Sequence, residues 1–201
     1  MKKSDDREKC RLTVVDGSHR TAAVTQIVQE KVLQEYDATV HVGLKTIAIN
    51  AAIARVDADG ERTIEVPQPE ELRAAAAITR CLVPIRLRGA EMKAMRKIMN
   101  LTLAELARKM DDRTAPETIS RWESEAQPMG GYAEKTLRLI VCETLREKAS
   151  GISYNAKMIV DLKVLDPWRI DPNYEIPIVC LQFLPMKEAS GSVVETWSNA
   201  A

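Results

Sequence analysis

The side chains best suited to recognising a partner lie in one segment, residues 91–123. Ile119 and Trp122 are three positions apart in the sequence. If residues 114–124 form a helix, both side chains therefore lie on one side of it and face the core. The outward face then carries small and polar residues: Pro116, Glu117, Ser120 and Arg121. Its arginine can donate two parallel hydrogen bonds and its glutamate can accept them, so this face has the chemistry of hydrogen-bonded recognition.

Two preceding helices are expected to position this face. An apolar stripe marks the first of them: Met92, Met95, Ile98 and Met99. Thr102, followed by a glutamate three residues later, has the pattern of a capping box and predicts the start of the second. The third helix has two possible starts, with Thr114 as the cap of a second capping box or with Ala115 as the cap before a proline. Two short helices joined by a tight turn, with an outward polar face, form the helix-turn-helix pattern.

Other chemistry is poorly supported. Asp57, Asp59 and Glu61 lack the further oxygen ligands of a calcium loop and predict a β-turn instead. His41 has no nucleophile nearby in a recognisable catalytic setting. Four cysteines occur without a CxxC pair: Cys10, Cys81, Cys142 and Cys180. We therefore expect buried free thiols, no metal site, no cofactor and no enzymatic activity.

Charge is distributed unevenly along the chain. The 201 residues contain 29 basic and 29 acidic side chains and are 45% apolar, which excludes a disordered chain. Residues 80–149 nevertheless contain 14 basic and 10 acidic residues, so this part can present a positive face to a polyanion. The charged amino terminus lacks the apolar stretch of a secretory signal, so we expect a cytoplasmic protein.

Two motifs carry a resemblance to a known family. Asn-Leu-Thr-Leu-Ala-Glu-Leu-Ala (100–107) and Thr-Ile-Ser-Arg-Trp-Glu (118–123) resemble the Cro/CI-like (XRE) helix-turn-helix regulators. The wider stretch 85–140 is similar to the DNA-binding domain of MqsA-type antitoxin regulators, without the zinc-binding cysteine pairs that those proteins carry upstream.

The resemblance implies that residues 114–124 are a recognition helix whose outward face reads base edges in the major groove. Arg121 would donate to O6 and N7 of guanine, and Glu117 would accept from a cytosine amino group. The alternative for Arg121 is pairing with Glu117 or Glu125 on its own helix. Arg96 and Glu123 match an ion pair that ties the first helix to the recognition helix in this family.

Several residues are candidates for contacts to DNA phosphates, which position a protein without reading sequence. The two threonines among them would act through the amides at their helix starts. The candidates are Lys93, Lys97, Thr102, Arg108, Lys109, Arg113 and Thr118.

The fold class that we expect is α+β. A mainly helical, five-helix-type helix-turn-helix DNA-binding domain (83–149) would follow a small amino-terminal α/β domain (18–82) that serves dimerisation or sensing. A flexible amino terminus (1–17) would precede them, and a carboxy-terminal extension with a loose tail (150–201) would follow.

Sequence patterns predict the remaining elements. Apolar spacing or helix propensity predicts helices at 21–36, 70–81 and 155–165, and residues 89–148 are expected to be nearly all helical. Strand-forming runs occur at 39–42, 46–49 and 63–66, with a turn at 57–60. The apolar run 176–184 predicts a strand or a docked arm, and the last dozen residues are expected to be loose.

These expectations point to a dimeric DNA-binding transcriptional regulator that represses its own promoter. A dimer would bind a palindromic operator, with half-sites about 34 Å apart. The alternative is an antitoxin-like protein-binding module that sequesters a toxin partner and binds DNA for autoregulation.

Overall fold

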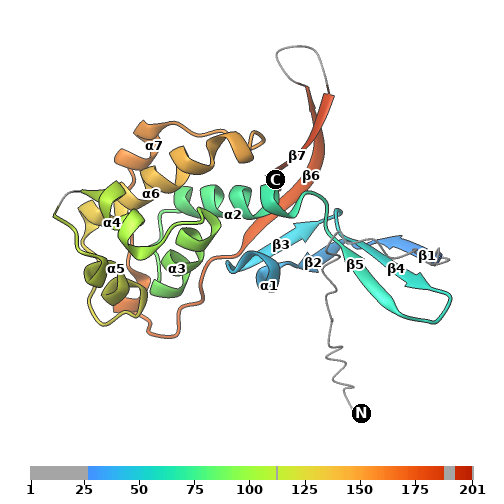
Figure 1. The fold of residues 1–201 in the computed structure, drawn as a ribbon, viewed down its shortest axis with the longest axis horizontal. Coiled ribbons are helices and arrows are strands. Elements are labelled where there is room, and N and C mark those ends of the chain that lie inside the picture. The colour runs from blue at the N-terminus through green and yellow to red at the C-terminus, as the bar shows by residue number, and fades with distance from the viewer. Residues whose placement is uncertain (1–26, 112, 188–192, 201) are drawn as a thin grey trace.

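The computed structural model describes residues 27–111, 113–187 and 193–200. Within these ranges the chain has a mixed α+β fold that contains helices and two separate sheets (Figure 1). The predicted fold class is confirmed at this level. The proposed flexible segment 1–17 lies outside the described residues.

The two sheets differ in how far apart their strands lie in the sequence. The antiparallel order β1-β4-β5 is local, with bounds Ile27–Val32, Ile53–Asp57 and Arg62–Glu65. The order β2-β3-β6-β7 joins both ends of the chain, with bounds Glu35–Asp37, Thr46–Ile49, Val179–Lys187 and Val193–Asn199. Its β3 and β6 are parallel, with Ile47 opposite Cys180. The carboxy-terminal hairpin thereby completes a sheet that begins near the amino-terminal end.

The helices gather on one side of the second sheet (Figure 1). Their bounds are α1 Thr39–Val42, α2 Pro69–Leu82, α3 Gly89–Ile98, α4 Leu103–Met110, α5 Pro116–Glu123, α6 Gly131–Leu145 and α7 Ala156–Val160, with short 3-10 turns η1 at Arg146–Lys148 and η2 at Pro167–Arg169. The central helix is α2, which contacts α6, α3 and both strands of the hairpin. Its Ala74–Ala77 run is fully buried, because small side chains let neighbouring elements approach closely.

Two buried arginines fix the connection between α2 and α3. Arg80 binds Glu91 through two contacts of 2.6 and 3.0 Å and donates to the carbonyl oxygens of Ile85 and Arg86. Arg138 donates to the carbonyl oxygens of Cys81, Val83 and Ile85 and to the Glu134 carboxylate. Guanidinium groups thus satisfy carbonyls at the end of α2 and in the segment that follows it.

Contacts cross both of the proposed domain limits. The Arg80–Glu91 pair bridges the limit at 82/83, and α2 packs against α6 from the other side of it. The hairpin β6–β7 packs on α2 and pairs with β3. One hydrophobic cluster includes residues from all three parts.

Several predicted elements are confirmed. The helix 70–81 lies within α2, and residues 89–148 are largely helical. The turn at 57–60 is closed by the Gly60 amide, which donates to the Asp57 carbonyl, and strands form at 46–49 and around 63–65. The apolar run 176–184 contributes most of strand β6.

Three predicted elements are wrong. The described part of the 21–36 segment forms strands β1 and β2, not a helix, because both strands pair with distant partners. The 39–42 run is helical, since the Asp37 carboxylate accepts the Thr39 amide at 2.9 Å and Gly43 ends the turn with a φ of 80°. The 155–165 helix is shorter than predicted, because α7 ends at Val160.

The carboxy-terminal tail is also ordered where it is described, contrary to the prediction. Residues 193–199 form β7, and Trp197 is fully buried. Its indole N–H donates to the Pro67 carbonyl, and its backbone amide donates to the Glu71 carboxylate. The tail is thus held by its pairing with β6 and by the burial of Trp197.

Candidate nucleic-acid interface

Helix α4 begins at the predicted capping box. The Glu105 amide donates to Thr102 Oγ1 at 3.2 Å, and the Thr102 amide donates to the Glu105 carboxylate at 2.7 Å. These hydrogen bonds from Thr102 hold the pKa of Glu105 below its ordinary value. On the opposite side, Leu106 and Ala107 are buried. The start of α4 is therefore fixed locally, and its inner face is fixed by the core.

The turn before α5 is organised by Asp111. Its carboxylate accepts the amides of Arg113 and Thr114 at 2.8 and 2.6 Å, which lowers the pKa of Asp111. Of the two predicted starts for α5, the structure has the one with Ala115 as the cap and Pro116 as the first helical residue. Proline is favoured there because its missing N–H would have had no helical partner.

Helix α5 has one buried face and one exposed face. Ile119 is fully buried and Trp122 is 8% exposed, as predicted. Of the residues predicted to contact bases, Pro116 is half-buried, and the other three are exposed: Glu117, Ser120 and Arg121. The structure therefore brings these side chains together on one accessible helical surface.

The Arg121 guanidinium makes no ion pair with any residue that the structure describes. The alternative pairing with Glu125 is not found, because the Glu125 carboxylate binds Arg88 through contacts of 2.8 and 2.5 Å. The planar donor group of Arg121 is thus free of an intramolecular ion pair in the described part of the chain.

An ion pair between Arg96 and Glu123 anchors α5 to α3. Nε and Nη2 of Arg96 lie 2.6 and 3.0 Å from the two carboxylate oxygens, and Nη1 donates to the Leu101 carbonyl at 2.9 Å. The hydrogen bond from Glu123 raises the pKa of Arg96, against the opposing effect of burial. The pair fixes the angle at which α5 leaves the core.

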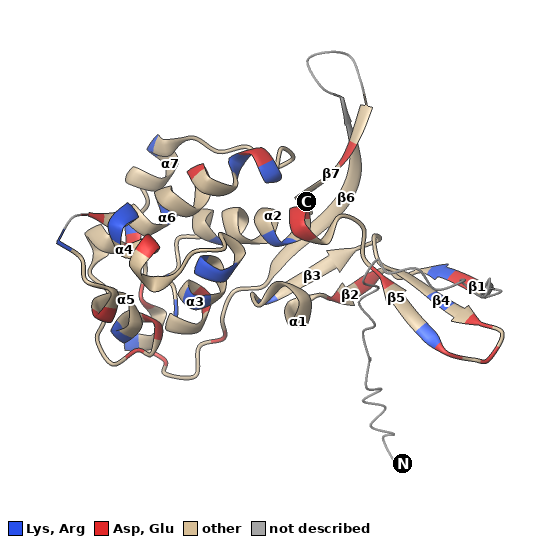
Figure 2. Cartoon of the chain, viewed as in Figure 1, with Lys and Arg blue, Asp and Glu red and all other residues tan. Residues whose placement is uncertain are grey.

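The basic residues predicted to contact phosphates are exposed and make no ion pairs within the described ranges. This set is Lys93, Lys97, Arg108, Lys109 and Arg113. Arginines elsewhere in the molecule are mostly paired with carboxylates, for example Arg55, Arg73 and Arg86. Figure 2 shows the basic residues distributed over α3, α4 and α5. Cations without an ion pair are therefore found on α3, on α4 and in the turn before α5.

The amides of the two threonines are already engaged. The Thr102 amide donates to Glu105, and the Thr118 amide donates to the Ala115 carbonyl at 3.0 Å. A phosphate contact by these two amides, as expected from the sequence, would require breaking the first turn of each helix. Only the side-chain hydroxyl of Thr118 is compatible with the observed geometry.

A groove between α1 and α3 brings Arg73, which pairs with Glu70, beside two of the predicted cations. It has a volume of about 390 Å³ and is lined by Lys93, Lys97 and Arg73, among others. Arg73 Nε donates to the His41 carbonyl at 3.0 Å. Burial, together with the charge of Arg73, lowers the pKa of His41. Sequence reasoning missed Arg73, because only tertiary packing brings α2 beside α3.

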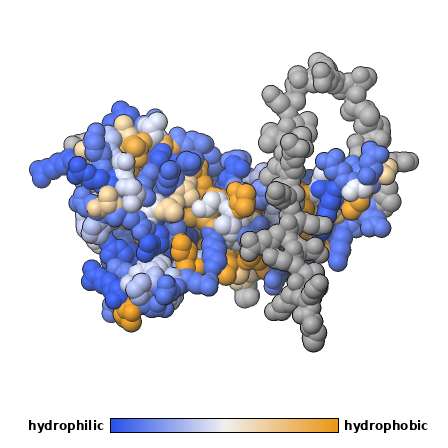
Figure 3. Space-filling view, turned by 90° about the horizontal axis from the view of Figure 1, so that it is seen from below, coloured by the Kyte–Doolittle hydropathy of each residue, from blue (hydrophilic) through white to orange (hydrophobic). Residues whose placement is uncertain are grey.

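The face that carries α1, α3 and α5 is mostly hydrophilic over its helical part, with scattered apolar patches (Figure 3).

No group of three or more metal-ligating side chains occurs within the described ranges. Among the helices in those same ranges, none has the length and apolar character needed to cross a membrane. Comparison of the chain with protein-family models, with curated proteins and with solved structures gives no match.

Proposed function

We propose that this protein is a sequence-specific regulator that binds double-stranded DNA through α4 and α5 as a helix-turn-helix. The observation that carries the proposal is the exposed guanidinium of Arg121, which lacks an intramolecular ion pair among the described residues. It stands on a helix whose other face is buried through Ile119 and anchored through Glu123. Such a side chain can bind an external acceptor without first losing an internal ion pair.

Recognition would then divide into two parts. Arg121 would donate to O6 and N7 of a guanine, and Glu117 would accept from a cytosine amino group, with Pro116 and Ser120 beside them. The unpaired cations on α3, α4 and the turn before α5 would bind phosphates. Each phosphate contact releases counterions, so affinity would fall as the salt concentration rises.

In this proposal the protein is a cytoplasmic homodimer that occupies a palindromic operator at its own promoter and blocks polymerase. Two recognition helices would lie about 34 Å apart, one helical turn of DNA. A single α5 presents only a few side chains to bases, which is why a second copy is required for specificity.

A second proposal is an antitoxin-like module that sequesters a protein toxin, with DNA binding as autoregulation. One observation favours it: the β6–β7 hairpin projects from the body (Figure 1), and its described residues Leu184, Val193 and Val194 expose 39 to 65% of their surface. Exposed apolar side chains on a projecting hairpin are suited to protein contacts. Capture of a protein partner that is lost with Val193→Ser would support this second function.

The decisive experiment is selection of bound duplexes from a random-sequence pool by the full chain. We expect enrichment of an inverted repeat whose half-site spacing corresponds to one turn of DNA. Retention of DNA without any enriched motif would contradict sequence-specific recognition, and absence of retention at low salt would contradict DNA binding altogether.

A further inference from the structure

The loop that follows α5, residues 124–130, is joined directly to the residue that we assign to base recognition. The Gln127 amide donates to the Arg121 carbonyl at 3.3 Å. Within this loop, Glu125 has a φ of 59°, in the left-handed region that residues other than glycine seldom adopt. Such a conformation persists only where surrounding contacts maintain it. The last turn of α5 therefore depends on the side chains that bind the loop.

Arg88 binds the loop at Glu125. Nε and Nη2 of Arg88 lie 2.8 and 2.5 Å from the two oxygens of the Glu125 carboxylate, and one of these oxygens also accepts the Gly89 amide at 2.9 Å. Both side chains of the ion pair are partly exposed. An exposed ion pair contributes little unless its geometry is fixed. What fixes the Arg88 guanidinium therefore decides how firmly the loop is held to the start of α3.

The carboxy-terminal extension supplies an aromatic ring beside Arg88. The guanidinium carbon of Arg88 lies 5.0 Å from the centroid of the Trp168 ring, which is a cation–π distance. The Trp168 ring is itself oriented, because its indole N–H donates to the Tyr174 carbonyl at 2.8 Å and the two rings meet edge to face. The extension thus restricts the guanidinium that binds Glu125.

Arg86 makes a second connection between the extension and the loop. Its Nη2 donates to the Met129 carbonyl, and its Nη1 lies 2.9 Å from the Asp166 carboxylate. The backbones are also joined, since the Arg86 amide donates to the Leu165 carbonyl and the Leu165 amide donates to the Pro84 carbonyl, both at 2.9 Å. The extension therefore runs beside this segment and shares its arginine with the loop.

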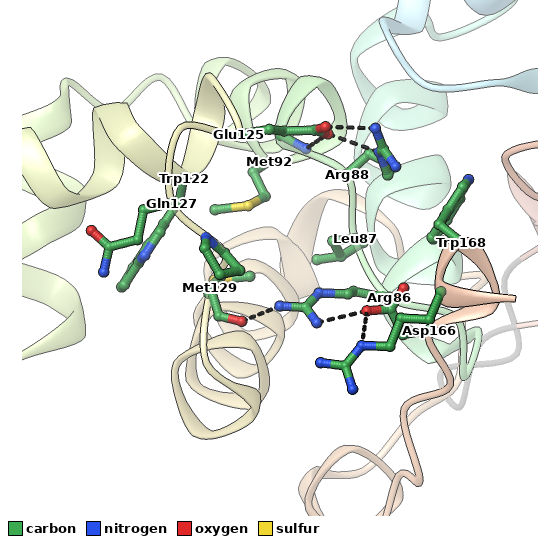
Figure 4. A pocket seen from close by; sticks show the side chains of 13 residues that line it. Arg86, Leu87, Arg88, Met92, Trp122, Glu125, Gln127, Met129, Asp166 and Trp168 are labelled. Carbon is green, nitrogen blue, oxygen red and sulfur yellow. Dashed lines mark hydrogen bonds and ion pairs between the residues drawn. The ribbon is translucent and has the colours of Figure 1, made fainter. Parts of the chain in front are cut away.

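Two routes thus lead from the extension to the loop, each through one arginine (Figure 4). They lie around a cavity of about 350 Å³, which Trp122 also lines. The loop is held by side chains that the extension itself contacts. The two routes are Trp168–Arg88–Glu125 and Asp166–Arg86–Met129.

We propose that the extension is part of the recognition site, with Trp168 as a positioning residue that holds α5 through Arg88. This inference rests on the proposed function, because it concerns the orientation of the helix that would read bases. Without the ring, Arg88 would meet the Glu125 carboxylate in a wider range of orientations, and the loop would hold the Arg121 carbonyl less firmly. Base contacts require closely fixed donors, whereas phosphate contacts carry no sequence information. Loss of the ring should therefore reduce discrimination between sequences.

The test variant is Trp168→Leu in the full chain. Trp168 is half-buried and does not belong to the hydrophobic core cluster of the described residues, so the variant should fold. Tyr154→Leu is the matched control, because the guanidinium carbon of Arg146 lies 5.3 Å from the centroid of the Tyr154 ring and Arg146 pairs with Glu143. Tyr154 is also half-buried but packs against the core. A general loss of stability would therefore be larger in the control.

Hydrogen exchange followed by mass spectrometry measures the loop without DNA. In Trp168→Leu the amides of residues 124–127 should exchange at least about threefold faster, the factor expected for losing one exposed cation–π contact, while exchange in α2 stays unchanged. Tyr154→Leu should match the parent there, and Trp168→Phe, which keeps a ring, should retain most of the protection. Unchanged exchange in Trp168→Leu, or equal acceleration in either of the other variants, would overturn the proposal.

Titration against the selected operator and a scrambled duplex measures recognition. Trp168→Leu should lower the ratio of the two affinities at least about threefold and leave the affinity for the scrambled duplex unchanged. A role in stability alone would not change this ratio, because both duplexes bind the same folded protein. An unaltered ratio despite faster exchange would overturn the role of the extension in recognition.

The two measurements separate this inference from the proposed function. Faster exchange in Trp168→Leu without any operator to select would contradict the regulator and the role in recognition, while the coupling of the extension to α5 would stand. A selected operator that Trp168→Leu and the parent bind with the same specificity would support the regulator and overturn this inference.

Discussion

Arg96 and Glu123 join α3 to α5 through two nitrogen–oxygen contacts, and both side chains are at least 87% buried. Buried pairs of this kind add little net stability, but breaking one from a single side is costly. The pair links residues 27 positions apart and fixes the helix that carries Arg121.

Glu123→Ala should lower the free energy of unfolding by about 3 kcal/mol, because it leaves the Arg96 charge buried without its partner. It should also weaken operator binding, since α5 loses its anchor. Denaturant unfolding and operator titration measure the two effects. The double variant Arg96→Leu/Glu123→Leu should recover part of the stability that Glu123→Ala loses. An unchanged unfolding midpoint for Glu123→Ala would show that the ion pair contributes nothing to stability.

Arg121→Ala should cost about 1–3 kcal/mol at the selected operator and relax preference at one base pair. Lys97→Ala should weaken binding to all duplexes alike and reduce the dependence of affinity on salt. Titration of both variants against the operator and a scrambled duplex separates the roles. Equal losses on the two duplexes for Arg121→Ala would make Arg121 a phosphate contact.

Gly89→Ala should destabilise the protein by about 1–3 kcal/mol, the usual cost of overpacking. An added Cβ would overlap the backbone carbonyl groups of Trp122 and Glu123, which are not flexible side-chain ends. Gly131→Ala is the matched control, since nothing lies within 4 Å of its Cβ position. Thermal unfolding compares the two, and similar behaviour would refute the close approach of α3 to α5.

Arg138→Met should lower the free energy of unfolding by about 3–5 kcal/mol. It would leave the Glu134 carboxylate buried without its cation and the carbonyls of Cys81 and Val83 without a donor. Arg146→Gln, on the exposed end of the same helical region, should leave the unfolding midpoint unchanged. A Met variant as stable as the parent would show that water replaces the guanidinium.

Stability should fall as the pH drops below 7, because burial lowers the pKa of folded His41 below its ordinary value of 6.5. Between the lowered pKa of folded His41 and the ordinary value of 6.5, the unfolded chain binds more protons than the folded protein does. The free energy of unfolding therefore rises with pH in this interval, and the contribution of His41 reaches its full value above 6.5. Denaturant unfolding at several pH values measures the slope. His41→Gln should flatten it, and an unaltered slope would assign the effect to other groups.

Local sequence patterns were sufficient for the helices that form the candidate site. The capping box at Thr102, the proline at 116 and the apolar spacing of Ile119 and Trp122 each act within one or two turns of helix, where hydrogen bonds join near neighbours. The exposed face of α5 therefore followed from the sequence. The family resemblance supplied the partner of Arg96, which spacing alone does not identify.

Strands were predicted less well, because their hydrogen bonds depend on partners far along the chain. Segment 21–36 has helical apolar spacing, yet its described part pairs with β3 and β4. The tail forms β7 only because β6, α2 and a buried pocket for Trp197 are in place. Intrinsic strand preference is weak compared with this context.

The sequence by itself determined the helices around α5, the residues on its exposed face and the concentration of basic charge, since these depend on composition and short-range spacing. Only the tertiary structure decided which cations lack partners, that Glu125 binds Arg88, and that Arg86, Trp122 and Trp168 enclose one cavity. Those relations join residues up to 82 positions apart, from Arg86 to Trp168. The physical reason is that ion pairs and cavities form between side chains whose proximity is set by the packing of the whole core.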